Sequence, residues 1–319
     1  MLRMHFSAGD LARTRIADGP DPLWETVLSM QQLHERRPEP LLDAWRRRAC
    51  RASRQAQRML APLMPGRGYF PDFLTPAAAA GGLDEGIEAV LRTPRRRLHT
   101  EMGLLAEGNS LPTWARSLGD GDTGALRHLG TALKQYHASV LTPRWPDIAA
   151  RVDRDRMTRT RTQCQVGTEA MLHTFAPMLH WRSPVLCADY PVDRDVYLQG
   201  RGLLLVPSYF CRRTPVALLN ETLHPVLVYP ARVVRRTVPV APCGRLAPLL
   251  GHTRAAVLQT LLEPRTTSEL AEFAGVSLSS ASEHAAVLRR AGLVNSTRDR
   301  HRVRHTLTPL GIDLLDGQP

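Results

Sequence analysis

Polar side chains gather near the start of a predicted helix in the C-terminal part of the chain. Ser279, Ser280, Ser282 and Glu283 lie there, on the side that the apolar residues of this helix leave open. Serine hydroxyls bond phosphate oxygens and base edges, and a glutamate accepts a hydrogen bond from the amino group of cytosine. These residue types at this place indicate hydrogen bonding to a nucleic acid.

A predicted hairpin farther along the chain carries a second group of charged side chains. Arg298, Arg300, Arg302 and Arg304 alternate along it, and the strand period of two predicts that they share one face. The segment 289–304 holds six arginines against one acidic residue, Asp299. Such a face suits contacts with the sugar–phosphate backbone or the minor groove of DNA.

Caps and turns in the sequence predict the elements that position these groups. Thr266 and Glu269 form the pattern of a capping box, which predicts a short helix that ends at Phe273. Gly275 stands where a helix C-cap needs a left-handed residue, and Ser277 is the next N-cap. The other predicted elements are a helix over 249–262, a helix over 278–291 with Ala281, Ala285, Leu288 and Ala291 facing inward, strands that begin at 293 and span 303–307, and a short last helix from Pro309.

Helix, short helix, tight turn, helix and hairpin are the layout of a winged helix-turn-helix domain. The turn holds two helices at a steep angle, so that the second helix can enter the major groove, which is roughly 12 Å wide. The N-terminus of that helix also favours a phosphate group.

The run TTSELAEFAGVSLSSASEHAAVLRRAGLVNSTRDRHRVRHTLTPLG resembles the ArsR family of bacterial winged-helix regulators. Three residues, Ser280, Ala281 and Ala285, are smaller than the usual Thr, Val and Leu of the family. The segments LWETV (23–27), GRGYFPDFL (66–74) and GRGLLLVPS (200–208) are similar to the long N-terminal domain of actinobacterial-type members. The residues that match the recognition-helix pattern of the family are Ser277, Ser282, His284, Leu288, Ala291, Gly292, Leu293 and Val294.

The resemblance implies a homodimeric repressor that binds double-stranded DNA. Metal sensors of the family carry a CxC pair before the recognition helix, where this chain has no cysteine, and Asp313 and Asp316 on the last helix lack a paired histidine. We therefore expect no metal and no cofactor. The candidate DNA-contacting residues are Ser277, Ser279, Ser280, Ser282, Glu283, His284, Arg289, Arg298, Arg300, Arg302 and Arg304.

Residues 1–240 are predicted to form an N-terminal regulatory or dimerisation domain, helical over 1–181 and β-rich over 182–231. The boundary is expected near residue 245, and the DNA-binding domain spans 246–319. The stretch 62–82 predicts a long loop, and Thr93 is the expected cap of a helix that begins at Pro94. Helices are predicted over 23–33, 41–60, 83–91, 94–107, 122–141, 146–163 and 168–179, and a further helix is capped by Ser7. A small antiparallel sheet is predicted over 185–188, 196–198, 202–206, 216–219 and 226–229. A further strand is predicted over 2–6.

The net charge of +12 favours a polyanionic partner. Residues 246–319 contribute only one unit of it, because they hold eight arginines and seven acidic residues. The predicted helix over 41–60 carries Arg47, Arg51, Arg54 and Arg58 on one face. This face is either an ordinary solvated surface or a contact with the backbone of flanking DNA.

The remaining features exclude several classes of protein. The five cysteines are scattered and form no CxxC pair, which argues against a disulfide framework and favours a reducing cytoplasm. No apolar run is long enough for a membrane span, and no secretory signal is expected. We predict that the protein is not an enzyme, because GxSxG, HExxH and P-loop patterns are absent.

The aromatic residues of the N-terminal domain have two interpretations. Tyr69, Phe70, Trp181, Tyr209 and Phe210 either line a pocket for a small organic effector, between the helices and the sheet, or are plain core.

Together these patterns predict an α+β protein: a mostly helical N-terminal domain with a small antiparallel sheet, followed by a winged helix-turn-helix domain. The function that fits is a sequence-specific transcriptional regulator, a cytoplasmic dimeric repressor under the control of a small organic effector. The alternative is a winged helix that serves as a protein-interaction or oligomerisation module without sequence-specific DNA binding.

Overall fold

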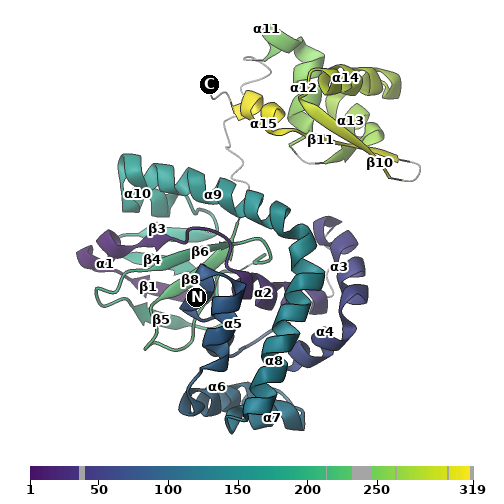
Figure 1. Ribbon diagram of the computed structural model, residues 1–319. Coiled ribbons are helices and arrows are strands. Elements are labelled where there is room, and N and C mark those ends of the chain that lie inside the picture. Colours follow the sequence, from purple (N-terminus) through teal and green to yellow (C-terminus); the bar gives the residue numbers. More distant parts are fainter. Residues whose placement is uncertain (36–39, 213, 232–245, 263, 300–301, 317–319) are drawn as a thin grey trace. The chain divides into compact units, whose positions relative to one another are not determined.

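The computed structural model describes residues 1–35, 40–212, 214–231, 246–262, 264–299 and 302–316 (Figure 1). The chain divides into two compact units, Met1–Val234 and Arg235–Pro319. The predicted boundary, between 240 and 246, falls on 232–245 and so lies outside the described residues. The fold class is α+β, as predicted.

The first unit is mainly helical, and most of its predicted helices are confirmed to within a few residues. The capping box of Ser7 and Asp10 begins the first helix as expected. The helices are α1 (Ala8–Arg13), α2 (Pro22–His34), α3 (Pro40–Ala52), α4 (Arg54–Leu60), α5 (Leu83–Leu91), α6 (Arg95–Gly108), α7 (Thr113–Gly119), α8 (Thr123–Tyr136), α9 (Trp145–Val166) and α10 (Thr168–His173). A π-helix over His137–Leu141 extends α8, and short 3₁₀ helices span Ala61–Leu63, Asp72–Leu74, Ala77–Gly81 and Thr142–Arg144.

Three predicted boundaries are wrong. The helix over 41–60 is two helices, because Ser53 has φ −153° and ψ 62°, which no helix accommodates. Pro94, not Thr93, occupies the N-cap position of α6. The helix predicted over 168–179 ends at His173, and a strand begins at Leu179.

The expectation of one small antiparallel sheet is also wrong, because the first unit has two four-stranded mixed sheets. The parallel pairs are β1 with β5, β2 with β6, and β6 with β8. The first sheet has the order β3 (Leu179–Arg182), β4 (Val185–Ala188), β1 (Leu2–His5), β5 (Arg194–Tyr197), and the second has the order β2 (Arg15–Ile16), β6 (Leu204–Ser208), β8 (Val226–Pro230), β7 (Val216–Ala217).

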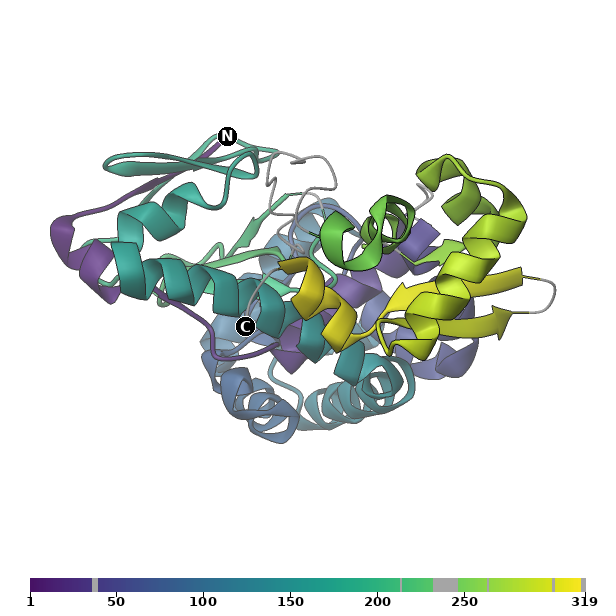
Figure 2. The ribbon, with the colours of Figure 1, turned by 90° about the horizontal axis from the view of Figure 1, so that it is seen from above.

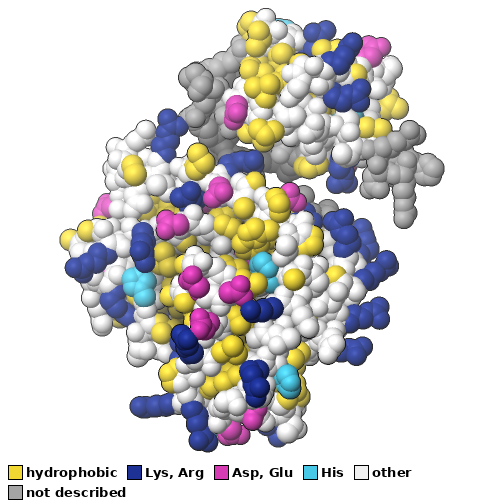
Figure 3. Space-filling model, in the orientation of Figure 1, with side chains coloured by type: hydrophobic (Ala, Val, Ile, Leu, Met, Phe, Trp, Pro, Cys, Tyr) yellow, Lys and Arg dark blue, Asp and Glu magenta, His cyan; other side chains and the backbone are white. Residues whose placement is uncertain are grey.

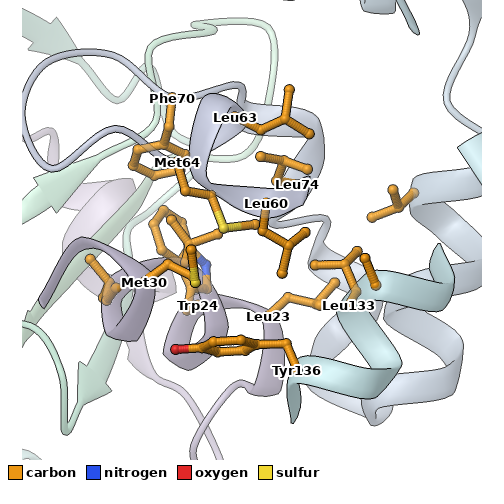
Figure 4. Packing of buried hydrophobic residues seen from close by; sticks show 14 of the residues in the cluster. Leu23, Trp24, Met30, Leu60, Leu63, Met64, Phe70, Leu74, Leu133 and Tyr136 are labelled. Carbon is orange, nitrogen blue, oxygen red and sulfur yellow. The ribbon is translucent and has the colours of Figure 1, made fainter. Parts of the chain in front are cut away.

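Strands β6 and β8 are buried on both faces, which is why their sequences are continuous apolar runs. Val206 and Val228 face a core that they share with the helices, whereas Leu205 and Leu227 face the core between the two sheets. Figure 4 shows the helical core, in which side chains of α2 and α8 meet those of α4. The hydroxyl of Tyr136 lies 3.0 Å from that of Ser29 there.

The aromatic residues considered for an effector pocket are packed in these cores. Phe70, Tyr209 and Phe210 are buried in the helical core, with Tyr69 packed against it, whereas Trp181 is buried in the core between the sheets. The five residues therefore do not line one pocket, and their interpretation as core residues is the one that the structure supports.

The second unit is a small three-stranded sheet with five helices among the described residues. Figure 2 shows its hairpin, β10 and β11, beside helix α14. The predicted helix over 249–262 is interrupted at Gly251, which has φ +81°. The elements are α11 (Ala247–Leu250), α12 (His252–Thr260), α13 (Thr267–Ala274), α14 (Leu278–Arg290) and α15 (Pro309–Asp316), with strands in the order β10 (Val294–Asp299), β11 (Arg302–Leu307), β9 (Arg265–Thr266).

Candidate nucleic-acid interface

Small residues on the inner face of α14 set its distance from α13 and α12. Ala281, Ala285 and Leu288 are buried against Leu270 of α13 and Leu258 of α12. Short side chains at the first two positions let the helices approach closely, so that the outer face of α14 is held rigidly outward. Ala291, which was expected to face inward, is exposed because α14 ends at Arg290.

The turn between α13 and α14 has the predicted geometry. Thr266 Oγ1 accepts from the backbone N–H of Glu269, and the Glu269 carboxylate accepts from the backbone N–H of Thr266 at 2.7 Å. The hydrogen bonds that the backbone N–H and the hydroxyl of Thr266 donate to this carboxylate lower the pKa of Glu269. Gly275 ends α13 with φ 65° and ψ 35°, the left-handed conformation that turns the chain into α14.

The polar side chains at the start of α14 differ in whether they have hydrogen-bond partners. Ser277 caps the helix by accepting from the backbone N–H of Ser280, and its Oγ lies 3.0 Å from the hydroxyls of Ser279 and Ser280. Ser282 and Glu283 are exposed, and within the described part of the chain their side chains make no hydrogen bond or ion pair. The exposed side of α14 thus presents one uncommitted hydroxyl and one uncommitted carboxylate beside a hydrogen-bonded serine cluster.

The other candidate residues of α14 lie farther along the helix. His284 is half-buried, whereas Arg289 is exposed in the last turn. The candidate set is therefore spread over the length of α14, with hydroxyl and carboxylate groups at its start and a cation near its end.

The register of the hairpin divides the predicted arginine face. Arg298 stands opposite Val303, whereas Arg304 stands opposite Thr297 and Arg302 opposite Asp299. Residues that face each other across an antiparallel pair share a side, and neighbours along a strand do not. The expectation of one shared face is thus wrong for Arg298, which occupies a position on the other side from Arg302 and Arg304, and Arg300 lies outside the described residues.

His305 anchors the hairpin to the helix-turn-helix and was not among the expected site residues. Its ring is buried, with Nε2 3.0 Å from Thr267 Oγ1 of α13 and Nδ1 2.8 Å from Ser296 Oγ of β10. Burial, with a smaller contribution from Arg289, lowers the pKa of His305, so that the ring stays neutral near pH 7. The strand period from the buried Val294 and its partner Leu307 is the signal that identifies this inward position.

Strand β9, which was also not expected, ties the same hairpin to the segment before α13. Residues 265 and 266 pair with His305 and Arg304 of β11. The guanidinium carbon of Arg265 lies 3.8 Å from the ring centroid of Phe273, which keeps this edge together. The hairpin is therefore fixed to α13 by backbone, side-chain and ring contacts.

Comparison with known proteins agrees with this geometry. The model of a helix-turn-helix domain family matches residues 252–297, which run from the first residue of α12 into β10. No curated protein and no solved structure matches the chain. The chain thus contains a helix-turn-helix domain, the module by which DNA-binding regulators contact DNA.

Among the described residues, no group of three His, Cys, Asp or Glu side chains lies together as a metal-ion site. Within the same part of the chain, no helix is both long and apolar enough to cross a membrane.

Proposed function

We propose that the protein is a sequence-specific transcriptional regulator of the ArsR kind, a cytoplasmic homodimeric repressor. The observation that carries the proposal is the matched helix-turn-helix, with Ser282 and Glu283 exposed and uncommitted on the outer face of α14. Ser277, Ser279, Ser280, His284, Arg289 and the hairpin arginines complete the contact surface. In this arrangement α14 reads base edges and Arg304 holds a phosphate or the minor groove.

Exposed apolar side chains support a dimer. Leu249 of α11 and Leu310 of α15 are 70% and 57% exposed, on helices that flank the helix-turn-helix. A second copy packed against them would remove this apolar surface from water, and a two-fold pair of winged helices reads half-sites about one helical turn of DNA apart. The proposed operator is therefore a palindrome.

The first unit supplies regulation in this proposal, through a small organic effector. A groove of about 290 Å³ between α4 and α8 is lined by residues that include Met59, Ala132 and Gln135. This volume is close to the lower end of the range for small-molecule sites, roughly 300 to 1,000 Å³. An apolar floor with amide groups beside it suits a small, partly polar molecule.

Selection of DNA fragments by the full-length protein tests the proposal. Random duplexes are bound at about 150 mM salt, where non-specific electrostatic binding is weak. Recovery of a palindromic motif supports a dimeric regulator. Recovery of unrelated fragments only contradicts it and favours the protein-interaction module.

A single-residue variant sharpens the same experiment. We expect Glu283→Gln to relax the preference at one base pair of each half-site, with a discrimination loss of about 1–3 kcal/mol, because the carboxylate accepts from a cytosine amino group. Glu107→Gln, an exposed glutamate of α6 with the same change of charge, is the matched control. An unchanged preference in Glu283→Gln would show that Glu283 does not discriminate between base pairs of the operator.

A further inference from the structure

Helices α3 and α4 carry a concentration of positive charge that the helix-turn-helix does not explain. The stretch 44–71 contains seven arginines and no acidic residue. Figure 3 shows Lys and Arg side chains gathered along these helices. Five of the arginines form an exposed surface that we call the basic ridge: Arg47, Arg48, Arg51, Arg54 and Arg58.

The inner faces of the two helices hold the ridge outward. Trp45 and Ala49 of α3 are buried, as are Ala56 and Leu60 of α4. The ring of Trp45 lies 4.6 Å from that of Phe210, between ring centroids, which fixes α3 to the loop after β6. The arginines therefore project from a rigid, buried support.

Two other helical arginines of the first unit have acidic partners one turn away, unlike the arginines of the basic ridge. Arg92 pairs with Glu88, and Arg97 pairs with Glu101 at 2.6 Å. In the described part of the chain no carboxylate lies within ion-pair distance of any arginine of the ridge.

Spacing within the ridge adds repulsion that nothing in the described residues offsets. Arg47 and Arg51 are four residues apart on α3, and Arg54 and Arg58 are four residues apart on α4. Like charges at this spacing destabilise a helix by a few tenths of a kcal/mol for each pair. A bound polyanion removes that repulsion, because each guanidinium then faces a phosphate.

We propose that the basic ridge binds the phosphate backbone of double-stranded DNA, a second DNA-contacting surface of the chain. The inference rests on the proposed function, because the helix-turn-helix is what brings the chain to DNA. Guanidinium groups match phosphate oxygens in a bidentate geometry and stay charged at every physiological pH. The ridge exposes cations and few groups that distinguish bases, so its contacts are independent of sequence and strengthen binding to operator and flanking DNA alike.

The salt dependence of DNA binding by the full-length protein tests the ridge. The variant R47Q/R51Q/R54Q/R58Q keeps good helix formers in both helices. The matched control, R96Q/R127Q/R154Q/R161Q, removes the same number of exposed arginines from α6, α8 and α9. Dissociation constants are measured from about 50 to 200 mM salt on the selected operator and on a duplex of random sequence.

We expect the slope of log affinity against log salt to become shallower by about 0.9 for each phosphate that the ridge variant no longer neutralises. At about 0.15 M salt, binding to both duplexes then weakens about five-fold for each such phosphate. The preference for operator over random DNA stays as in the wild type, and the control variant keeps most of the wild-type slope.

Three outcomes overturn the inference: a wild-type slope in the ridge variant, an equal loss in the control, or a loss confined to the operator. A variant with lysine at the same four positions separates charge from folding, and it must restore most of the slope. If the wild type selects no sequence, the proposed function fails, and the slopes on the random duplex still decide whether the ridge binds phosphates.

Discussion

The polar contacts inside the first unit and those inside the second unit join residues at different separations along the chain. In the second unit the capping bonds join near neighbours, Thr266 with Glu269 and Ser277 with Ser280. In the first unit buried groups join distant segments. The Glu25 carboxylate, for example, accepts from the backbone N–H groups of Tyr209 and Phe210 at 2.6 and 3.1 Å.

A second long-range cluster of the first unit shows the same principle. The hydroxyl of Tyr229 donates to Asp155 at 2.7 Å, and the buried Arg159 donates to the same carboxylate at 3.0 Å. Local capping bonds act before the chain has folded, whereas buried charges gain partners only when the whole unit forms. The first unit should therefore depend on single buried polar residues, and the second on backbone conformation at its turn.

The largest expected effect is at Asp155. Asp155→Ala leaves the guanidinium of Arg159 buried without its charge partner, and we expect a loss of about 3–5 kcal/mol in the free energy of unfolding. Asp153→Ala, which removes a half-exposed partner 3.7 Å from Arg156, should cost no more than about 1 kcal/mol. Denaturant unfolding of the two variants measures the difference, and equal losses would contradict the contrast between buried and exposed pairs.

The next effect is a pH dependence that originates at Glu25. Burial raises its pKa from an ordinary value of 4.5 to about 7, although the N–H groups of Tyr209 and Phe210 and the hydroxyl of Ser208 act in the opposite direction. The pKa of Glu25 is higher in the folded state than in the unfolded state. Its contribution to the free energy of unfolding is therefore fully present below pH 4.5 and is lost as the pH rises through about 7. Its size is about 3 kcal/mol.

Unfolding free energies measured from about pH 4 to pH 8 check this prediction. Burial also raises the pKa values of Asp21 and Asp72 to about 6. Part of the decline in the free energy of unfolding of the wild type therefore comes from these two groups. The difference between wild type and Glu25→Gln isolates Glu25. Parallel curves for the two proteins would show that Glu25 does not titrate in this range.

The smallest expected effect is in the second unit, at the turn before α14. Gly275→Ala places a side chain on a left-handed residue, which costs about 1–2 kcal/mol although a Cβ there meets no atom within 4 Å. Gly103→Ala is the control, because this exposed glycine lies inside α6, and we expect it to stabilise the protein by about 0.5–1 kcal/mol. Thermal unfolding and operator binding check both variants. A Gly275→Ala protein with full stability would contradict the expected cost of a side chain on this left-handed residue.

The sequence by itself determined the local structure of the second unit. The capping box at Thr266, the left-handed Gly275 and the cap at Ser277 act between residues a few positions apart, so their pattern in the chain predicts the helix-turn-helix. The sequence also predicted a helix over 122–141, where α8 lies, for the same reason, because a helical period needs only neighbouring turns.

Tertiary structure alone decided which strands pair and which faces the candidate residues share. Strand β1 pairs with β4 and β5 near residue 190, and no periodicity within either segment specifies a partner so far along the chain. The side on which Arg298 stands depends on the register of the hairpin, which places it opposite Val303. The break at Ser53 divides a pattern that reads as one helix, because α3 and α4 each turn an apolar face to the common core. Pairing, register and packing are settled by contacts between distant segments, which a local pattern does not contain.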